Sequence, residues 1–181
     1  SLDEDFQAAL PDGWTLENMG IVGGMLNTDF FLTEGDTAFV ITPETGPVNE
    51  HEYFVFDYTL QTNNGDDTLG SGDVMEVQLS LDCGLSYTTL LIIDTTTYDP
   101  TGGVNTDTLD LSPYVDEDVY IRVIATKQEA ASSHTSSFQL QVDNFEIKEI
   151  YDVSTEDILL QTGSCWQSSE LVQVVVRNNS P

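Results

Sequence analysis

Basic residues are the scarcest feature of this chain. It has four Lys and Arg side chains against 32 Asp and Glu, and a formal charge of -28 at pH 7. Such a surface repels nucleic acid and anionic membranes, so we expect neither as a partner. Carboxylates attract hard cations such as calcium, and their mutual repulsion is screened by salt, which favours a saline or calcium-rich extracellular setting. An acidic, solvated surface without any specific ion is the alternative.

Cysteine, histidine and long apolar runs are also scarce. Cys83 and Cys165 are too few for a disulfide scaffold, and the sequence leaves open whether they pair. No apolar run approaches the ~20 residues that span a bilayer, so we expect no membrane insertion. His51 and His134, the two histidines, lie in no zinc-binding spacing, and no phosphate-binding glycine motif is present.

The scarcity of catalytic motifs predicts a protein that is not an enzyme, and we assign no catalytic residue. Paired acids of the kind that hydrolyse glycosides stay open, because 32 carboxylates guarantee chance pairs. Hydrolysis of a glycan or a peptide by this chain alone would support an enzymatic function instead.

Strand patterns dominate what the sequence does contain. Apolar residues alternate with polar ones in three segments, Tyr53 to Leu60, Val74 to Leu81 and Val119 to Ala125. Segments 37–42, 88–94 and 138–147 read as further strands, separated by turn-rich loops such as 63–67 and 99–103. Many short alternating strands with polar connections predict an all-β, antiparallel sandwich with Greek-key or jelly-roll links.

Both ends of this strand-rich region carry acids. Asp3, Glu4 and Asp5 precede Phe6 in a first strand, and Asp143-Asn144 lies inside the last one. The alternation that places Val142 inside breaks before Phe145, which predicts a β-bulge at Asp143-Asn144; a strand with two covered faces is the alternative. We expect the first and last strands to meet in one sheet, where their carboxylates would need a cation between them.

A domain boundary is expected near Tyr151 to Thr155. Residues 1–150 form the predicted sandwich domain, and 151–181 form a linker and a strand-rich segment that includes Glu170 to Val176. This segment is either the start of a following domain or an extra strand docked on the sandwich.

Several segments, in order, resemble the cleaved-adhesin or choice-of-anchor J family of jelly-roll domains, which are similar to MAM domains. The opening is Leu10-Pro11-Asp12-Gly13-Trp14-Thr15, and the later segments are Phe39 to Pro43, Phe54 to Tyr58, Asp73 to Leu90 and Phe138 to Ile147. The resemblance covers roughly Leu2 to Ile150. Two departures are Tyr87, where a Trp is common, and Gly20 to Gly24, which replaces a Trp-rich segment. The tail from Gly163 resembles the start of the immunoglobulin-like modules that follow such domains.

The resemblance implies a structural calcium ion. Glu4 or Asp5 on the first strand and Asp143 on the last would supply ligands, with Asp36 as a plausible third. The ion would clamp the two ends of the domain together. The alternative is that these are ordinary acids at strand ends.

The resemblance also implies a function. It predicts a non-catalytic adhesion or carbohydrate- or protein-binding module of a larger secreted or cell-surface protein, exported by a type IX pathway. An ancillary domain of a secreted protease or glycoside hydrolase, with the catalytic domain elsewhere in the polypeptide, is the alternative. Partners would be a surface glycan or protein and the neighbouring domains. Aromatic rings stack on sugars, and Tyr98 has the best loop context for this role, although a packed loop tyrosine is the competing interpretation.

Overall fold

The structure is a computed structural model of the whole chain. It describes residues 2–7, 9–28, 35–62, 69–70, 72–99, 103–128, 138–150, 153–160 and 172–178. For residues 61, 62, 138, 153–160 and 172–178 it describes the backbone only. No helix in these ranges is long and apolar enough to cross a membrane.

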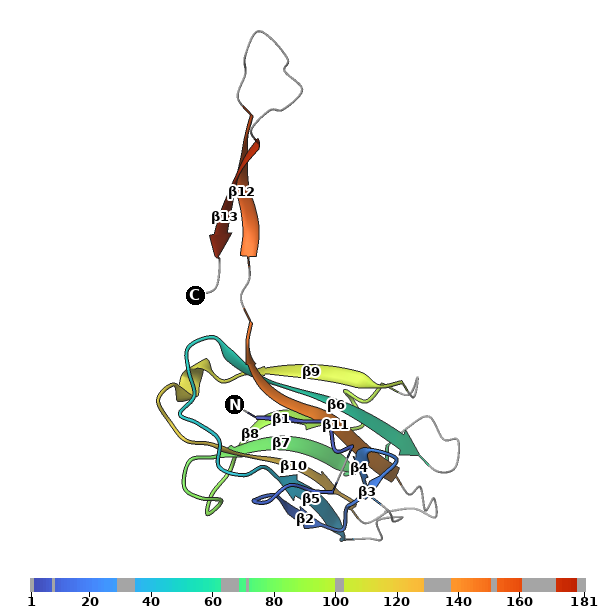
Figure 1. Cartoon of the computed structure of the whole chain (residues 1–181). Coiled ribbons are helices and arrows are strands. Elements are labelled where there is room, and N and C mark those ends of the chain that lie inside the picture. The colour runs from blue at the N-terminus through green and yellow to red at the C-terminus, as the bar shows by residue number, and fades with distance from the viewer. Residues whose placement is uncertain are drawn as a thin grey trace.

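Two antiparallel sheets face each other in the body of the molecule (Figure 1). The first has the strand order β3-β4-β11-β6-β9, with β1 also paired to β11. Its strands are β1 (Asp3–Glu4), β3 (Gly20–Val22), β4 (Met25–Asn27), β6 (Glu52–Thr62), β9 (Asn105–Asp110) and β11 (Phe138–Glu149).

The second sheet has the order β2-β5-β10-β7-β8. Its strands are β2 (Thr15–Glu17), β5 (Thr37–Ile41), β7 (Val74–Ser80), β8 (Thr88–Ile93) and β10 (Tyr120–Thr126). A single 3-10 turn, η1 (Ser112–Tyr114), is the helical element of the described residues. Neighbouring strands are mostly distant in sequence, as jelly-roll connections require, so the predicted all-β antiparallel sandwich is confirmed.

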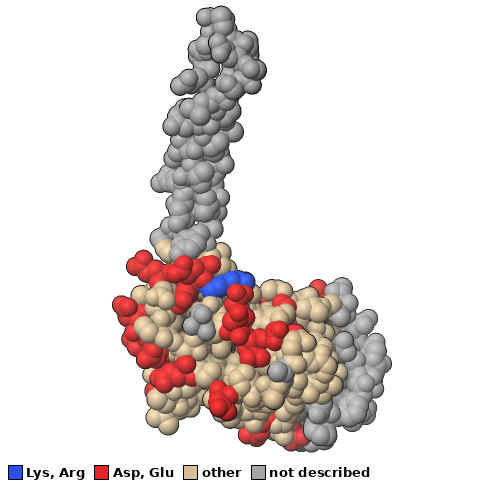
Figure 2. Space-filling view, in the orientation of Figure 1, with Lys and Arg blue, Asp and Glu red and all other residues tan. Residues whose placement is uncertain are grey.

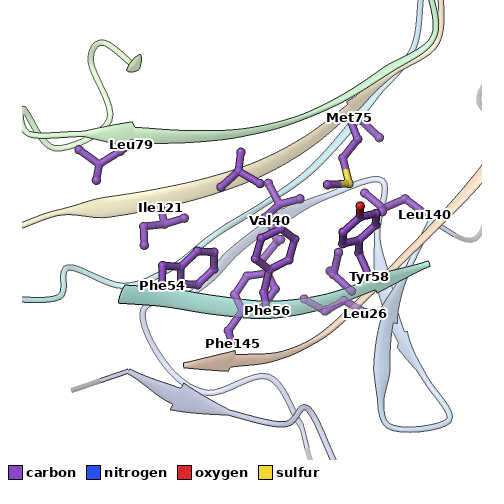
Figure 3. Packing of buried hydrophobic residues seen from close by; sticks show 14 of the residues in the cluster. Leu26, Val40, Phe54, Phe56, Tyr58, Met75, Leu79, Ile121, Leu140 and Phe145 are labelled. Atoms are coloured by element: carbon purple, nitrogen blue, oxygen red, sulfur yellow. The ribbon is translucent and has the colours of Figure 1, made fainter. Parts of the chain in front are cut away.

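Side chains that alternate along the strands fill the space between the sheets. On β6, Phe54 and Phe56 are fully buried and point toward the second sheet (Figure 3). Val123 of β10 and Val77 of β7, on the second sheet, are also fully buried and belong to the same core cluster. The period of two predicted from the sequence therefore places one face of each central strand in a common core.

An aromatic cluster packs the N-terminal segment against this core. Phe6 is fully buried, and its ring lies edge-on to Trp14 at 5.1 Å and to Phe145 at 5.4 Å. Edge-to-face pairs at this spacing are favourable beyond the area that they bury. Phe145 also contacts Phe54 at 5.3 Å, so the cluster joins the segment after β1 to β11 and β6.

The bulge predicted in the last strand is present. The register of β11 against β6 shifts between Asp143 and Glu146, and Asn144 has a φ of 54°. The extra residue lets Phe145 turn into the core, where it is fully buried. At the end of the bulge, β1 pairs with β11 through Asp3–Glu146 and Glu4–Phe145. The expectation that the first and last strands meet in one sheet is confirmed.

Two strands follow the sandwich in the chain. β12 (Val153–Leu160) and β13 (Val172–Asn178) pair with each other, and within the described ranges neither pairs with a strand of the two larger sheets (Figure 1). β13 contains most of the strand predicted from Glu170. The boundary near residue 150 and the nature of a following module stay predictions.

Candidate functional site: carboxylates at the β11 bulge

Two carboxylates face each other where β11 bulges. Asp143 of β11 is the direct cross-strand partner of Asp57 of β6. Like charges placed opposite each other on one sheet face destabilise the pairing. The pKa of Asp143 is raised above its ordinary value, first by burial and then by the charges of Asp5, Asp57 and Glu4, while a hydrogen bond from the backbone of Asn144 opposes the shift. Negative charge is therefore concentrated here.

The bulge residue Asn144 orients both of these acids. Its backbone N–H donates to Oδ1 of Asp143 at 2.9 Å, and its side-chain Nδ2 donates to Oδ2 of Asp57 at 2.7 Å. The hydroxyl of Thr106, which faces Asp57 on β9, donates to the other oxygen of Asp57. Asn144, whose φ is positive, thus contacts an acid of its own strand and an acid of β6.

The N-terminal acids come from the segment that β1 pins to β11. Glu4 Oε1 accepts a hydrogen bond from the backbone N–H of Phe6 at 2.8 Å, and Asp5 Oδ1 accepts one from Gln7 at 3.1 Å. These short turns hold both carboxylates in place as the chain passes from the strand into the aromatic cluster. The structure thus brings Glu4, Asp5 and Asp143 within electrostatic reach of one another.

The negative charge of this site suits a hard cation, but the present positions of its side chains do not. Carboxylate oxygens are the ligands that calcium prefers. Within the described ranges, however, no group of three His, Cys, Asp or Glu side chains is placed so that it could hold a metal ion. In the present structure the side chains of Glu4, Asp5, Asp57 and Asp143 are therefore not arranged as a metal-binding group.

Similarity to proteins of known structure was found, although similarity in sequence was not. No family model matches the chain, and no curated protein matches it. The K1 cleaved adhesin domain of Lys-gingipain from Porphyromonas gingivalis W83 superposes with a TM-score of 0.55 at 17% identity, covering 82% of this chain and 98% of that one. The K3 domain of the same protein gives 0.53 at 15% identity, covering 81% and 97%. This chain has the cleaved-adhesin fold.

Looser matches to the cleaved-adhesin fold of this chain include carbohydrate-binding modules. One that is specific for non-crystalline cellulose has a TM-score of 0.49 and 14% identity, and the match covers 82% of this chain and 93% of that one. At 17% and 15% identity the two adhesin domains establish the fold alone, which the sequence resemblance predicted.

Two other predicted site residues of this cleaved-adhesin fold have contacts with residues outside the bulge. Asp36 precedes β5 of the second sheet, and its carbonyl accepts a hydrogen bond from the backbone N–H of Lys127 at 2.9 Å. Tyr98 is half-buried and packs against the core, and its hydroxyl donates to the carbonyl of Leu60 at 3.3 Å. These contacts fit the packed-loop interpretation of Tyr98. Cys83 is exposed, and Cys165 lies outside the described residues.

Sequence reasoning missed Asp57. It lies in the segment Phe54 to Tyr58, where the alternation shows only that it faces away from the core. Its position opposite Asp143 depends on the register between β6 and β11, which are 87 residues apart at the Asn144–Asp57 hydrogen bond. The one sequence feature that could have pointed to Asp57 is that it is an acid on the outer face of a central strand.

Proposed function

We propose that this chain is a non-catalytic adhesion or carbohydrate- or protein-binding module of a larger secreted protein, stabilised by calcium. The observation that carries the proposal is the fold shared with two domains that are themselves described as adhesin domains. Both of those domains are parts of one larger protein, Lys-gingipain, which supports a role within a multidomain polypeptide. The acidic surface seen in Figure 2 is in keeping with an extracellular, salt-screened setting.

Calcium would act as a structural clamp. Glu4 and Asp5 belong to the N-terminal segment, Asp57 to β6 and Asp143 to β11, so one ion bound among them would tie three parts of the first sheet together. The ion would supply positive charge where the cross-strand pair of Asp57 and Asp143 lacks it. We assign Asp36 no part in this clamp, because it precedes a strand of the second sheet.

Thermal unfolding with EDTA and with millimolar calcium tests the clamp. We expect calcium to raise the melting temperature of the wild-type chain, with a gain of about 2.7 kcal/mol at 100 times the dissociation constant. Asp143→Asn should abolish the gain. Asp36→Asn is the matched control, since it removes one acid from the other sheet, and it should keep the gain. An equal response of both variants, or no response of the wild type, would refute the clamp.

An ancillary role beside a catalytic domain is the second candidate. The origin of both similar adhesin domains in one larger protein favours it to the same extent as it favours the first. The sequence of the full polypeptide would distinguish the ancillary role from adhesion. A catalytic module in the same polypeptide would support the ancillary role, and repeated binding modules would support adhesion.

A further inference from the structure

A pocket of about 150 Å³ lies on the outer face of the first sheet. Its floor comes from the adjacent strands β11 and β6, and its two sides come from β4 and from the residue just before β9. The strands β4, β11, β6 and β9 lie next to one another in the sheet order, so the residues that line the pocket come from adjacent parts of one sheet.

The floor and the walls differ in chemistry. Asp57, Gln141 and Asn144 place a carboxylate and two amides on the floor. Met25 and Val104 provide apolar walls from opposite sides, and Val104 is 71% exposed. Apolar walls around a few converging polar groups are the usual composition of a small-molecule site.

We propose that the pocket binds one neutral pyranose ring of a glycan. A closed cavity of about 150 Å³ accepts benzene, so an open pocket of this size can take one face of a pyranose ring while the rest of the sugar stays in solvent. Sugar hydroxyls donate to carboxylate and amide oxygens and accept from amide N–H groups, so they match the polar floor of the pocket. The C–H faces of the ring match Met25 and Val104. This inference rests on the proposed binding function and names its ligand class and site.

Other occupants match these features less well. A purely apolar ligand would cover the polar floor without offering it any hydrogen-bond partner. An acidic sugar would be repelled by a chain of charge -28 and by Asp57 and Asp143.

Saturation-transfer NMR and calorimetry on the full chain test the proposal. The probes are the methyl glycosides of glucose, galactose and mannose, together with a printed array of neutral glycans. The variants are Gln141→Ala and Val104→Ser, with Ile92→Ser as the control, because Ile92 is 48% exposed on a strand of the other sheet. We expect at least one neutral probe to bind, and the loss of one amide hydrogen bond in Gln141→Ala to weaken it by up to about tenfold.

Val104→Ser should also weaken binding, and because Val104 is largely exposed this variant remains informative if Gln141→Ala fails to fold. Ile92→Ser should bind like the wild type. If glycans bind equally well to both pocket variants, the binding function stands and this site is wrong. If the chain binds a protein surface and no neutral glycan, the ligand class is wrong. If it binds neither, the proposed function itself fails.

Discussion

The buried ion pair between Lys127 and Asp73 gives the strongest single test of the packing described here. Lys127 Nζ lies 2.7 Å from Asp73 Oδ2, and the two side chains are 8% and 1% exposed. Asp73 also accepts hydrogen bonds from the backbone N–H groups of Gly70 and Gln128. Lys127→Met would leave this carboxylate buried without its counter-charge, which costs about 3–5 kcal/mol.

Urea and thermal unfolding measure this cost. For a chain of this size, 1 kcal/mol corresponds to about 2–4 °C, so we expect the melting temperature to fall by roughly 6–20 °C. Lys148→Met is the matched control, because the Lys148–Glu146 pair is 42% and 39% exposed and should contribute less than about 1 kcal/mol. The double variant Asp73→Asn/Lys127→Met should lose less than the sum of the single changes. Equal losses for Lys127→Met and Lys148→Met would refute the reasoning.

Three further predictions concern single side chains, each read by thermal unfolding. Burial and the nearby acids raise the pKa of Asp143 above its ordinary value of 3.8. The charged form of Asp143 therefore destabilises the folded chain above pH 3.8, and this destabilisation is absent below that pH. In EDTA, Asp143→Asn should accordingly raise the melting temperature at pH 7 and leave it unchanged at pH 3. Hydrogen bonds from the Ser86 hydroxyl, the Ser86 backbone and Ser80 lower the pKa of Asp82 to about 2, so Asp82→Asn should destabilise the chain at pH 7 and lose this effect as the pH falls toward 2. Phe145→Ala should cost about 3–5 kcal/mol, because it empties the centre of the aromatic cluster; a cost below 1 kcal/mol would contradict that packing.

The sequence predicted the fold well because its signals are local. Alternation along Tyr53 to Leu60 and Val119 to Ala125 identifies core-facing residues without any knowledge of the partners of those strands. The break in alternation before Phe145 located the bulge for the same reason. Where apolar residues repeat with a period of two, burial follows directly from the pattern.

The site was predicted only in part, because it depends on register between distant strands. Glu4, Asp5 and Asp143 were expected together, since the ends of the strand-rich region carry conspicuous acids. Asp57 and the pocket that it shares with Val104 were not expected, because neither the β6–β11 nor the β6–β9 pairing can be counted along the chain. Asp36 precedes a strand of the second sheet, and this too could not be predicted, because a single sequence does not reveal the order of strands in the sheets.

The central claim is that this chain is a non-catalytic binding module. The most direct test measures whether the intact chain retains ligands and whether the retained ligands stay uncleaved. The chain is incubated in millimolar calcium with an array of glycans and surface proteins, and the recovered ligands are analysed for new reducing ends or new peptide termini. The account predicts that at least one ligand is retained and that none is cleaved. Cleavage of a retained ligand, or the absence of any retained ligand, would contradict a non-catalytic binding module.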